Sequence, residues 1–395
     1  MSPDRTAAPA VPRMQLPAGE DFLLLSPTQQ AHAYRNVDRM FATRRIARGG
    51  HVLPLPRGAE IAPVYRRDGR GFTVADYVGR MNTAGLLVLQ GDTIRLERYA
   101  LGLDEATRWS SMSMVKSLTA TLVGAALQDG AIRSLDEPVS AYLPALRGCA
   151  YDAVTIRHLI TMSSGVDWTE DYTDRNSHVN LYSKSLGDKV PGGVLALMRS
   201  LRAKHPPGSQ FNYNTGDTYV LGALVTAATG MPLADYMSRK IWARLGMECD
   251  AFYTLESEGG QEIGGSRAGA CLRDFGRFGV FLLNDGMIGD GQNGGGRVLP
   301  PGWVEAAGRI AFATDPAAHS YGAAGYGYSW WIDADGAMVA VGFAGQTLYI
   351  NRRKNIVIVT LSCFPQPPYA AAYGIDFKAE RFAFKDAVVD LLAGA

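Results

Sequence analysis

Residues 110–116 read Ser-Ser-Met-Ser-Met-Val-Lys and lie at the start of the first long helix that the sequence predicts, from about Met114 to Gln128. Ser113 and Lys116 are three residues apart, so on a helix their side chains share one face. A serine hydroxyl attacks a carbonyl once a neighbouring group takes its proton, and a lysine can take it where burial lowers its pKa. The spacing alone, however, favours a simpler interpretation, a capped helix with a solvated lysine.

Two later segments carry residues that could complete such a site. The turn-rich loop at residues 206–217 delivers Tyr213 just before a predicted helix, and a phenol near a lysine can relay a proton to a leaving group. Residues 342–346, Gly-Phe-Ala-Gly-Gln, enter a predicted strand. Small residues such as Gly345 allow close approach of a substrate, and the backbone N–H of Gln346 could hold an oxyanion. Each segment also has a structural interpretation, an ordinary loop tyrosine and a β-bulge.

In this order along the chain, the three segments resemble the motifs of the serine β-lactamase and penicillin-binding protein superfamily. That superfamily has Ser-x-x-Lys, then a Tyr-x-Asn-type loop, then a Lys-Thr-Gly-type strand. The resemblance extends over about residues 80–395. Further similar stretches are residues 155–165, 211–222, 229–230, 241–247 and 325–331.

Within the superfamily, the chain looks most like the esterase and amidase branch that includes 6-aminohexanoate-dimer (nylon oligomer) hydrolases. Residues 170–174, Glu-Asp-Tyr-Thr-Asp, match the Glu-Asp-Tyr segment of that branch. The resemblance implies that Tyr172 holds the substrate amide. The Gly345-Gln346 entry into the late strand is also typical of this branch.

The chain departs from the superfamily at two motif positions. Phe343-Ala344 stands where β-lactamases and DD-peptidases have Lys-Thr, so the cation that pairs with the carboxylate of a penicillin is missing. Thr215 takes the place of the asparagine in the tyrosine loop. Both departures argue against efficient β-lactam hydrolysis. For an acid that would bind a substrate amine, Asp174 and Asp188 are candidates only by their closeness to Tyr172.

Periodicity and resemblance together predict an α/β (α+β) chain with a β-lactamase/transpeptidase-like antiparallel sheet flanked by helices. We expect residues 1–75 to form an N-terminal extension that packs on the main domain, residues 76–395, with a helical subdomain at about 106–254. A hairpin over residues 86–97 and a group of late strands predict that both ends of the chain build the sheet. The late strands are predicted at Tyr326–Ile332, Met338–Gly342, Thr347–Asn351 and Ile356–Ser362, before a final helix from about Phe377 to Leu392.

Composition excludes several function classes. The 395 residues are 47% hydrophobic and 19% charged, which allows a sizeable core and argues against disorder. Lys and Arg total 39 against 38 Asp and Glu, a net charge of +1, so we expect neither a nucleic-acid nor a membrane partner. No apolar run suits a transmembrane helix or a secretory signal, which predicts a soluble, cytoplasmic protein. A homodimer is left open.

No metal or cofactor is expected. The four cysteines are far apart and form no CxxC pair, so no zinc site or disulfide framework follows from their spacing. Gly289, Gly291 and Gly294 match a dinucleotide fingerprint, but their loop is predicted to open no helix.

The sequence therefore predicts a cofactor-free serine hydrolase that acts on a small-molecule amide or ester. Ser113 attacks the carbonyl, Lys116 accepts its proton and Tyr213 passes a proton to the leaving group. The backbone N–H groups of Ser113 and Gln346 would hold the oxyanion. Two alternatives stay open, a carboxylesterase without amide activity and a penicillin-recognising binding protein with little turnover.

Overall fold

The computed structural model describes residues 19–289, 296–318, 321–365 and 374–393. Residues 1–18 of the predicted N-terminal extension lie outside the described residues, as do Gly291 and Gly294 of the glycine pattern.

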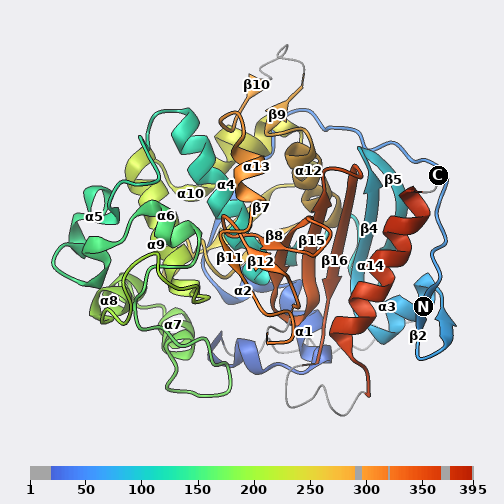
Figure 1. The fold of residues 1–395 in the computed structure, drawn as a ribbon, viewed down its shortest axis with the longest axis horizontal. Coiled ribbons are helices and arrows are strands. Elements are labelled where there is room, and N and C mark those ends of the chain that lie inside the picture. Colours follow the sequence, from blue (N-terminus) through green and yellow to red (C-terminus); the bar gives the residue numbers. More distant parts are fainter. Residues whose placement is uncertain (1–18, 290–295, 319–320, 366–373, 394–395) are drawn as a thin grey trace, which may run out of the picture.

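One eight-stranded antiparallel sheet organises the molecule, in the order β11-β12-β13-β14-β15-β16-β4-β5 (Figure 1). The two ends of the chain meet where β16 pairs with β4, with Ile358 opposite Val88. The predicted α+β class and the sheet built from both chain ends are thus confirmed. The strands of this sheet are β4 (Thr83–Gln90), β5 (Thr93–Tyr99), β11 (Phe312–Ala313), β12 (Gly325–Tyr326), β13 (Trp331–Ile332), β14 (Met338–Gly342), β15 (Gln346–Asn351) and β16 (Ile356–Ser362).

The central strands are buried on both faces, because a helix covers each. Successive side chains of a strand point to opposite faces. Leu86 and Val88 of β4 pack in a cluster with residues of α14 (Phe377–Ala393), whereas Leu87 and Leu89 face α12 (Leu272–Leu283). Gly276 lets α12 approach closely, since a Cβ there would lie 2.6 Å from the Leu87 side chain. This two-sided burial explains the continuous apolar run of β4.

Beside the sheet lies a helical region centred on α4 (Val115–Gln128) and α9 (Thr215–Thr229), which pack on each other (Figure 1). Both helices are apolar and mostly buried. The further helices of the chain are α1 (Pro27–Tyr34), α2 (Val37–Met40), α3 (Val74–Arg80), α5 (Val139–Tyr142), α6 (Ile156–Ile160), α7 (His178–Gly187), α8 (Gly193–Ser200), α10 (Leu233–Met237), α11 (Ala243–Leu245) and α13 (Trp303–Ala307).

The N-terminal segment adds to the main core. Phe22 and Tyr34 are buried there, and β1 (Thr43–Ile46) pairs with β7 (Ala251–Thr254). These strands belong to a four-stranded sheet in the order β1-β7-β8-β6. The other short strands are β2 (Tyr65–Arg67), β3 (Arg70–Phe72), β6 (Trp109–Ser110), β8 (Ala268–Ala270), β9 (Met287–Ile288) and β10 (Gly296–Arg297). The division at residue 75 stays a prediction.

The predicted strand Tyr326–Ile332 is wrong as a single element. The chain forms β12 and β13 there, joined by a tight turn in which Ser329 has φ 57° and the Gly327 N–H donates to the Trp330 carbonyl. A residue in the left-handed region reverses the chain and ends the strand.

Within the described residues, no single helix is long and apolar enough to cross a membrane. One bent pair of helices, Thr215–Thr229 and Leu233–Leu245, meets the length and composition criteria together, with a 74° bend between them.

Candidate active site

Ser113 lies in a single helical turn, Met112–Met114, that leads directly into α4. Met112 before it has φ 46°, in the left-handed region, so the chain turns sharply just before Ser113. The end of β14 touches this turn, since a Cβ on Gly342 would lie 2.4 Å from the Ser111 carbonyl oxygen. A glycine is therefore required at position 342, which ties the third sequence motif to the first.

Lys116 is one turn further along and is 1% exposed. Its Nζ lies 3.0 Å from Ser113 Oγ and 3.0 Å from Thr215 Oγ1, and it donates to the Gly265 carbonyl. Burial lowers the pKa of Lys116 to about 8, against the opposing field of Glu170. A large fraction of free amine is thus present at mildly alkaline pH, in contact with the serine hydroxyl.

Tyr213 stands beside this pair, just before α9. Asn214 caps that helix, since its side chain accepts a hydrogen bond from the Asp217 N–H. The Lys116 Nζ lies 5.0 Å from the centroid of the Tyr213 ring. Burial and the Glu170 carboxylate raise the pKa of Tyr213 well above its usual value, while a hydrogen bond with Ser113 lowers it. The phenol therefore keeps its proton at neutral pH and can donate it.

Glu170 connects these residues, and the sequence reasoning did not assign it a role. Its carboxylate accepts hydrogen bonds from the Tyr172 hydroxyl at 2.8 Å, from the Thr215 N–H at 3.2 Å and from the Thr215 hydroxyl. The indole N–H of Trp168 also donates to it. Two signals in the sequence could have identified this network: Glu170 is two residues before Tyr172 in the matched segment, and Thr215 occupies a motif position.

A cavity of about 610 Å³ opens in front of the serine. Ser113, Tyr172, Tyr213 and Gly345 line it, and Lys116 lies behind Ser113. The other lining residues are Glu170, Phe211, Asn212, Tyr321, Trp331, Val341, Gly342, Phe343, Ala344, Phe364, Pro365, Phe377, Lys378 and Arg381. Its size and its mostly apolar wall suit a small organic substrate.

Gln346 does not line this cavity with its side chain, which is fully buried. The side-chain amide accepts from the Trp109 indole at 3.0 Å and from the Ser362 N–H at 3.0 Å, and it donates to the Ser362 carbonyl at 2.7 Å. These contacts fix the bend at the entry to β15. The oxyanion role of the Gln346 N–H stays a prediction.

Two further sequence candidates are not part of the cavity lining. Asp174 accepts from Asn180 through its backbone carbonyl, and Asp188 pairs with Lys184 at the end of α7. Among the described residues that line the cavity, the carboxylate side chain is that of Glu170. The lining also contains cations, Lys378 and Arg381, which come from α14.

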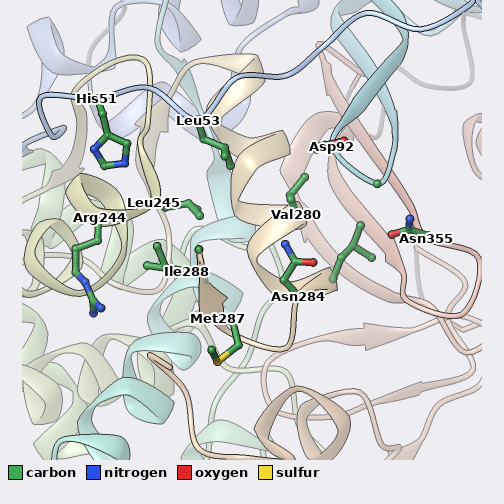
Figure 2. A pocket seen from close by; sticks show the side chains of 13 residues that line it. His51, Leu53, Asp92, Arg244, Leu245, Val280, Asn284, Met287, Ile288 and Asn355 are labelled. Atoms are coloured by element: carbon green, nitrogen blue, oxygen red, sulfur yellow. The ribbon is translucent and has the colours of Figure 1, made fainter. Parts of the chain in front are cut away.

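A second cavity, of about 560 Å³, lies elsewhere in the molecule (Figure 2). His51, Arg244 and Asn284 are among the residues that line it, as Figure 2 shows. Neither Ser113 nor Tyr213 lines it. Because Ser113 and Tyr213 line the first cavity, with Lys116 behind Ser113, the first cavity is the candidate active site.

One group of side chains outside both cavities has metal-ligand atoms close together. The ligand atoms of Cys249, Cys271 and Asp274 lie within 4.8 Å of one another. The Asp274 carboxylate, however, accepts from the N–H groups of Glu248 and Cys249 and from the Arg277 guanidinium. These hydrogen bonds give the Asp274 carboxylate a structural role, in which it holds the start of α12 against residues 248 and 249.

The antiparallel sheet, the flanking helices and the Ser-x-x-Lys pair opposite a tyrosine define a serine hydrolase of the β-lactamase fold. The chain belongs to the Beta-lactamase family, whose family model matches residues 73–380. The resemblance predicted from the motifs is thus confirmed.

Three known proteins illustrate the relationship. The chain is 30% identical over 358 residues to the 6-aminohexanoate-dimer hydrolase of Paenarthrobacter ureafaciens, covering 87% of this chain and 88% of that protein. It is 30% identical over 166 residues to esterase EstB of Burkholderia gladioli, covering 39% and 41%. A solved Bacillus anthracis structure, provisionally named a 6-aminohexanoate-dimer hydrolase, superposes with a TM-score of 0.77 at 23% identity, covering 92% of this chain and 94% of that one.

Proposed function

We propose that this protein hydrolyses small amides and esters through an acyl-enzyme on Ser113. The observation that carries this proposal is the contact of Lys116 Nζ with Ser113 Oγ at 3.0 Å, with the pKa of Lys116 lowered to about 8 and Tyr213 beside it. A buried amine with a lowered pKa against a hydroxyl is an arrangement that can activate a serine.

The reaction proceeds in two halves. Ser113 Oγ adds to the carbonyl carbon while its proton passes to Lys116, and the bond to the leaving group then breaks as Tyr213 donates a proton to the departing nitrogen or oxygen. The Tyr213 oxygen recovers a proton from Lys116. A water molecule then attacks the acyl-enzyme by the same route, releasing the acid and restoring the Ser113 hydroxyl. No cofactor enters this scheme.

Amide cleavage is supported by Tyr172, which lies on the cavity wall with its hydroxyl bound to Glu170 at 2.8 Å. The curated relative that aligns over most of the chain is named for an amide substrate, whereas EstB is named as an esterase. A carboxylesterase without amide activity is the second candidate. A penicillin-recognising protein with little turnover is disfavoured by Phe343-Ala344 at the Lys-Thr positions.

The test combines labelling with turnover. A fluorophosphonate probe should label Ser113, and mapping of the labelled peptide should find no second site. Ser113→Ala should lose the label and about 10⁴-fold or more of the activity on p-nitrophenyl butyrate and on 6-aminohexanoate oligomers. Ser200→Ala, an exposed serine of α8, is the matched control and should retain both.

The same experiment separates the alternatives. Ester turnover without any oligomer cleavage would leave the carboxylesterase. Stable labelling by a fluorescent penicillin, with no turnover of either substrate, would favour the penicillin-recognising protein. A Ser113→Ala variant with near-normal ester turnover would refute the proposed nucleophile.

A further inference from the structure

Two cysteines that are distant in sequence are brought together by strand pairing. Strand β7 pairs with β8 in antiparallel register, with Phe252 opposite Gly269. Cys249 lies three residues before Phe252 and Cys271 lies two residues after Gly269, so both are at the same end of this strand pair. Both are free thiols, and their sulfur atoms lie within 4.8 Å of each other. The fold therefore creates a thiol pair that the sequence spacing does not indicate.

Helix α12 fixes the backbone of both cysteines. Cys271 is the N-cap residue of this helix, and its carbonyl accepts a hydrogen bond from the Asp274 N–H at 3.1 Å. The Asp274 carboxylate accepts from the Cys249 N–H at 2.9 Å. On its other side, the Cys249 carbonyl accepts from the Trp242 indole at 2.9 Å. One residue of α12 thus contacts the backbone of both cysteines, so their closeness does not depend on side-chain rotamers alone.

The two thiols differ in exposure and in acidity. Cys249 is partly exposed, whereas Cys271 is buried, with its sulfur 3.3 Å from the Ala106 carbonyl oxygen. A hydrogen bond from Cys271 lowers the pKa of the Cys249 thiol, against the opposing effects of burial and of the Asp274 charge. The same hydrogen bond and burial raise the pKa of Cys271. An accessible thiol of lowered pKa reacts first with an oxidant, so Cys249 is the attacking residue and Cys271 the resolving one.

A metal ion is the other partner that two thiols and a carboxylate could take, and the surroundings disfavour it. One oxygen of the Asp274 carboxylate already accepts from the Glu248 N–H at 2.8 Å and from the Arg277 guanidinium at 2.8 Å. A fixed positive charge at this distance repels a cation. The group has three possible ligand residues within the part of the chain that the structure describes, whereas a structural zinc site uses four. A covalent bond between the two sulfur atoms is therefore the favoured chemistry.

We propose that Cys249 and Cys271 form an oxidation site that reacts with hydrogen peroxide or an organic hydroperoxide and closes a reversible intramolecular disulfide. The Cys249 thiolate attacks one peroxide oxygen, the O–O bond breaks, and water or an alcohol leaves with the thiol proton. Cys249 is then a sulfenic acid. The Cys271 sulfur attacks the Cys249 sulfur, and the hydroxyl group leaves as water with the Cys271 proton. Two thiols are oxidised and one peroxide is reduced, and a dithiol reductant reverses the reaction.

The disulfide would close a loop over residues 249–271, which supports the serine end of the catalytic cavity. Within this loop the Ala268 N–H donates to the Ser111 hydroxyl at 3.0 Å, and the Gly265 carbonyl accepts from Lys116. Closing a loop of this length restricts the unfolded chain, so the oxidised protein should unfold at a temperature about 2–5 °C higher. Neither cysteine lines the catalytic cavity, so the inference does not depend on the proposed function.

The test treats the folded, reduced protein with one equivalent of hydrogen peroxide in the presence of EDTA. The number of thiols titrated after denaturation should fall from four to two, and the mass should fall by about 2 Da, the two hydrogen atoms lost. Trypsin cleaves after Arg267 and so separates the two cysteines. The non-reduced digest should contain the Cys249 peptide joined to the Cys271 peptide, and dithiothreitol should release both. Thermal unfolding of the oxidised and reduced samples measures the stabilisation.

Single variants test the separate roles of the two thiols. Cys271→Ala should leave a sulfenic acid on Cys249 that dimedone traps, and excess peroxide should convert it to the sulfinic acid. Cys249→Ser should leave Cys271 unreacted, because that thiol is buried. Cys149→Ser is the matched control, since this half-buried thiol donates to the Leu146 carbonyl at 3.0 Å, and it should form the same disulfide as the native protein.

The mapping of the native protein decides the inference even if a variant fails to fold. A native digest without the linked peptides after one equivalent of peroxide would overturn it, as would linkage that appears only after unfolding. A disulfide that joins other cysteines, or two chains, would also overturn it. Zinc that stays bound through dialysis against EDTA and blocks both thiols would assign the group to a metal instead.

Discussion

The two ends of the catalytic cavity differ in how completely their charged groups are bonded. At the serine end, Lys116 has three polar partners and Glu170 accepts hydrogen bonds from three residues. At the α14 end, Arg381 donates a hydrogen bond to the Tyr321 carbonyl at 2.7 Å, and its buried Nε has no partner among the residues that the structure describes. A closed network holds its groups in a fixed geometry, and a buried donor without a partner is a feature that costs stability. The two ends of the cavity therefore differ in how many of their polar groups are bonded within the described residues.

The electrostatics of the two ends follow from their surroundings. At the serine end, burial lowers the pKa of Lys116 to about 8, so the free amine forms at mildly alkaline pH. Burial also raises the pKa of Tyr213, so the phenol keeps its proton there. The charge of Glu170 opposes the first shift and increases the second. At the other end, an arginine stays charged at any accessible pH. The first end therefore has groups that can exchange a proton, and the second has a fixed positive charge.

The largest effect is expected from Lys116→Arg, which tests whether the serine end uses a base. A guanidinium cannot release its proton at working pH, so this variant should lose as much kcat as Lys116→Ala, about 10³-fold or more. The measurement is kcat for p-nitrophenyl butyrate, with thermal unfolding to verify that each variant is folded. An active arginine variant would mean that Lys116 acts only as a fixed charge. The serine end would then not differ from the α14 end in having a cation that must lose its proton.

Tyr213→Phe is expected to have the next largest effect, and it tests the proposed proton donor beside Lys116. An amine must be protonated to leave, whereas p-nitrophenolate leaves unaided, so amide turnover should fall by about 10²–10⁴-fold and ester turnover by less. The assay is kcat on a 6-aminohexanoate oligomer and on a p-nitrophenyl ester. Phe211→Leu, a change in a cavity residue without a hydroxyl, is the control for altered packing. Equal losses on both substrates would remove Tyr213 as the proton donor.

The pH dependence of the native protein should report Lys116. The active form carries the free amine, so kcat/KM should rise with pH to a midpoint near 8 and fall about tenfold per unit well below it. Glu170→Gln removes a negative charge that raises the pKa of Lys116, so its midpoint should move to lower pH. Asp171→Asn changes the adjacent exposed acid and should leave the midpoint in place. If the pH midpoint of Glu170→Gln were unchanged or higher, Glu170 would not be raising the pKa of Lys116.

The sequence predicted the serine end better than the α14 end for a physical reason. Ser113 and Lys116 are one helical turn apart, and Tyr213 follows a turn-rich loop, so local spacing and motif order carry the signal. The contact between Glu170 and Thr215 depends on a loop that folds back onto α9, so the matched segment points to Glu170 without showing which residues it contacts. Arg381 lies on a helix that was predicted, yet a single arginine on such a helix gives no sign of the cavity that it faces.

The same reasoning applies to the strands. Alternation and apolar runs predicted the strands that pair β4 with β16, because both faces of the sheet are covered. They did not predict the break between β12 and β13, where one serine takes a left-handed conformation and reverses the chain. A backbone state at a single residue leaves almost no trace in hydrophobic periodicity.

Tyr172→Phe should have the smallest effect. It tests whether the Tyr172 hydroxyl contacts the substrate amide or only supports Glu170 and Lys116. The Tyr172 hydroxyl donates to Glu170 at 2.8 Å, and its ring lies 5.1 Å from that of Phe343, so the side chain spans the bonded network and the cavity wall. Its proposed partner is the amide nitrogen of the substrate, so removing the hydroxyl should lower kcat/KM several-fold for an amide and spare a p-nitrophenyl ester. A neutral hydrogen bond is worth about 0.5–1.5 kcal/mol, which sets that scale. The measurement is kcat and KM of the variant on one amide and one ester, together with its pH midpoint. A shifted midpoint with equal losses on both substrates would place Tyr172 with Glu170 as a support of Lys116, and would leave the amide without a recognition residue on this wall.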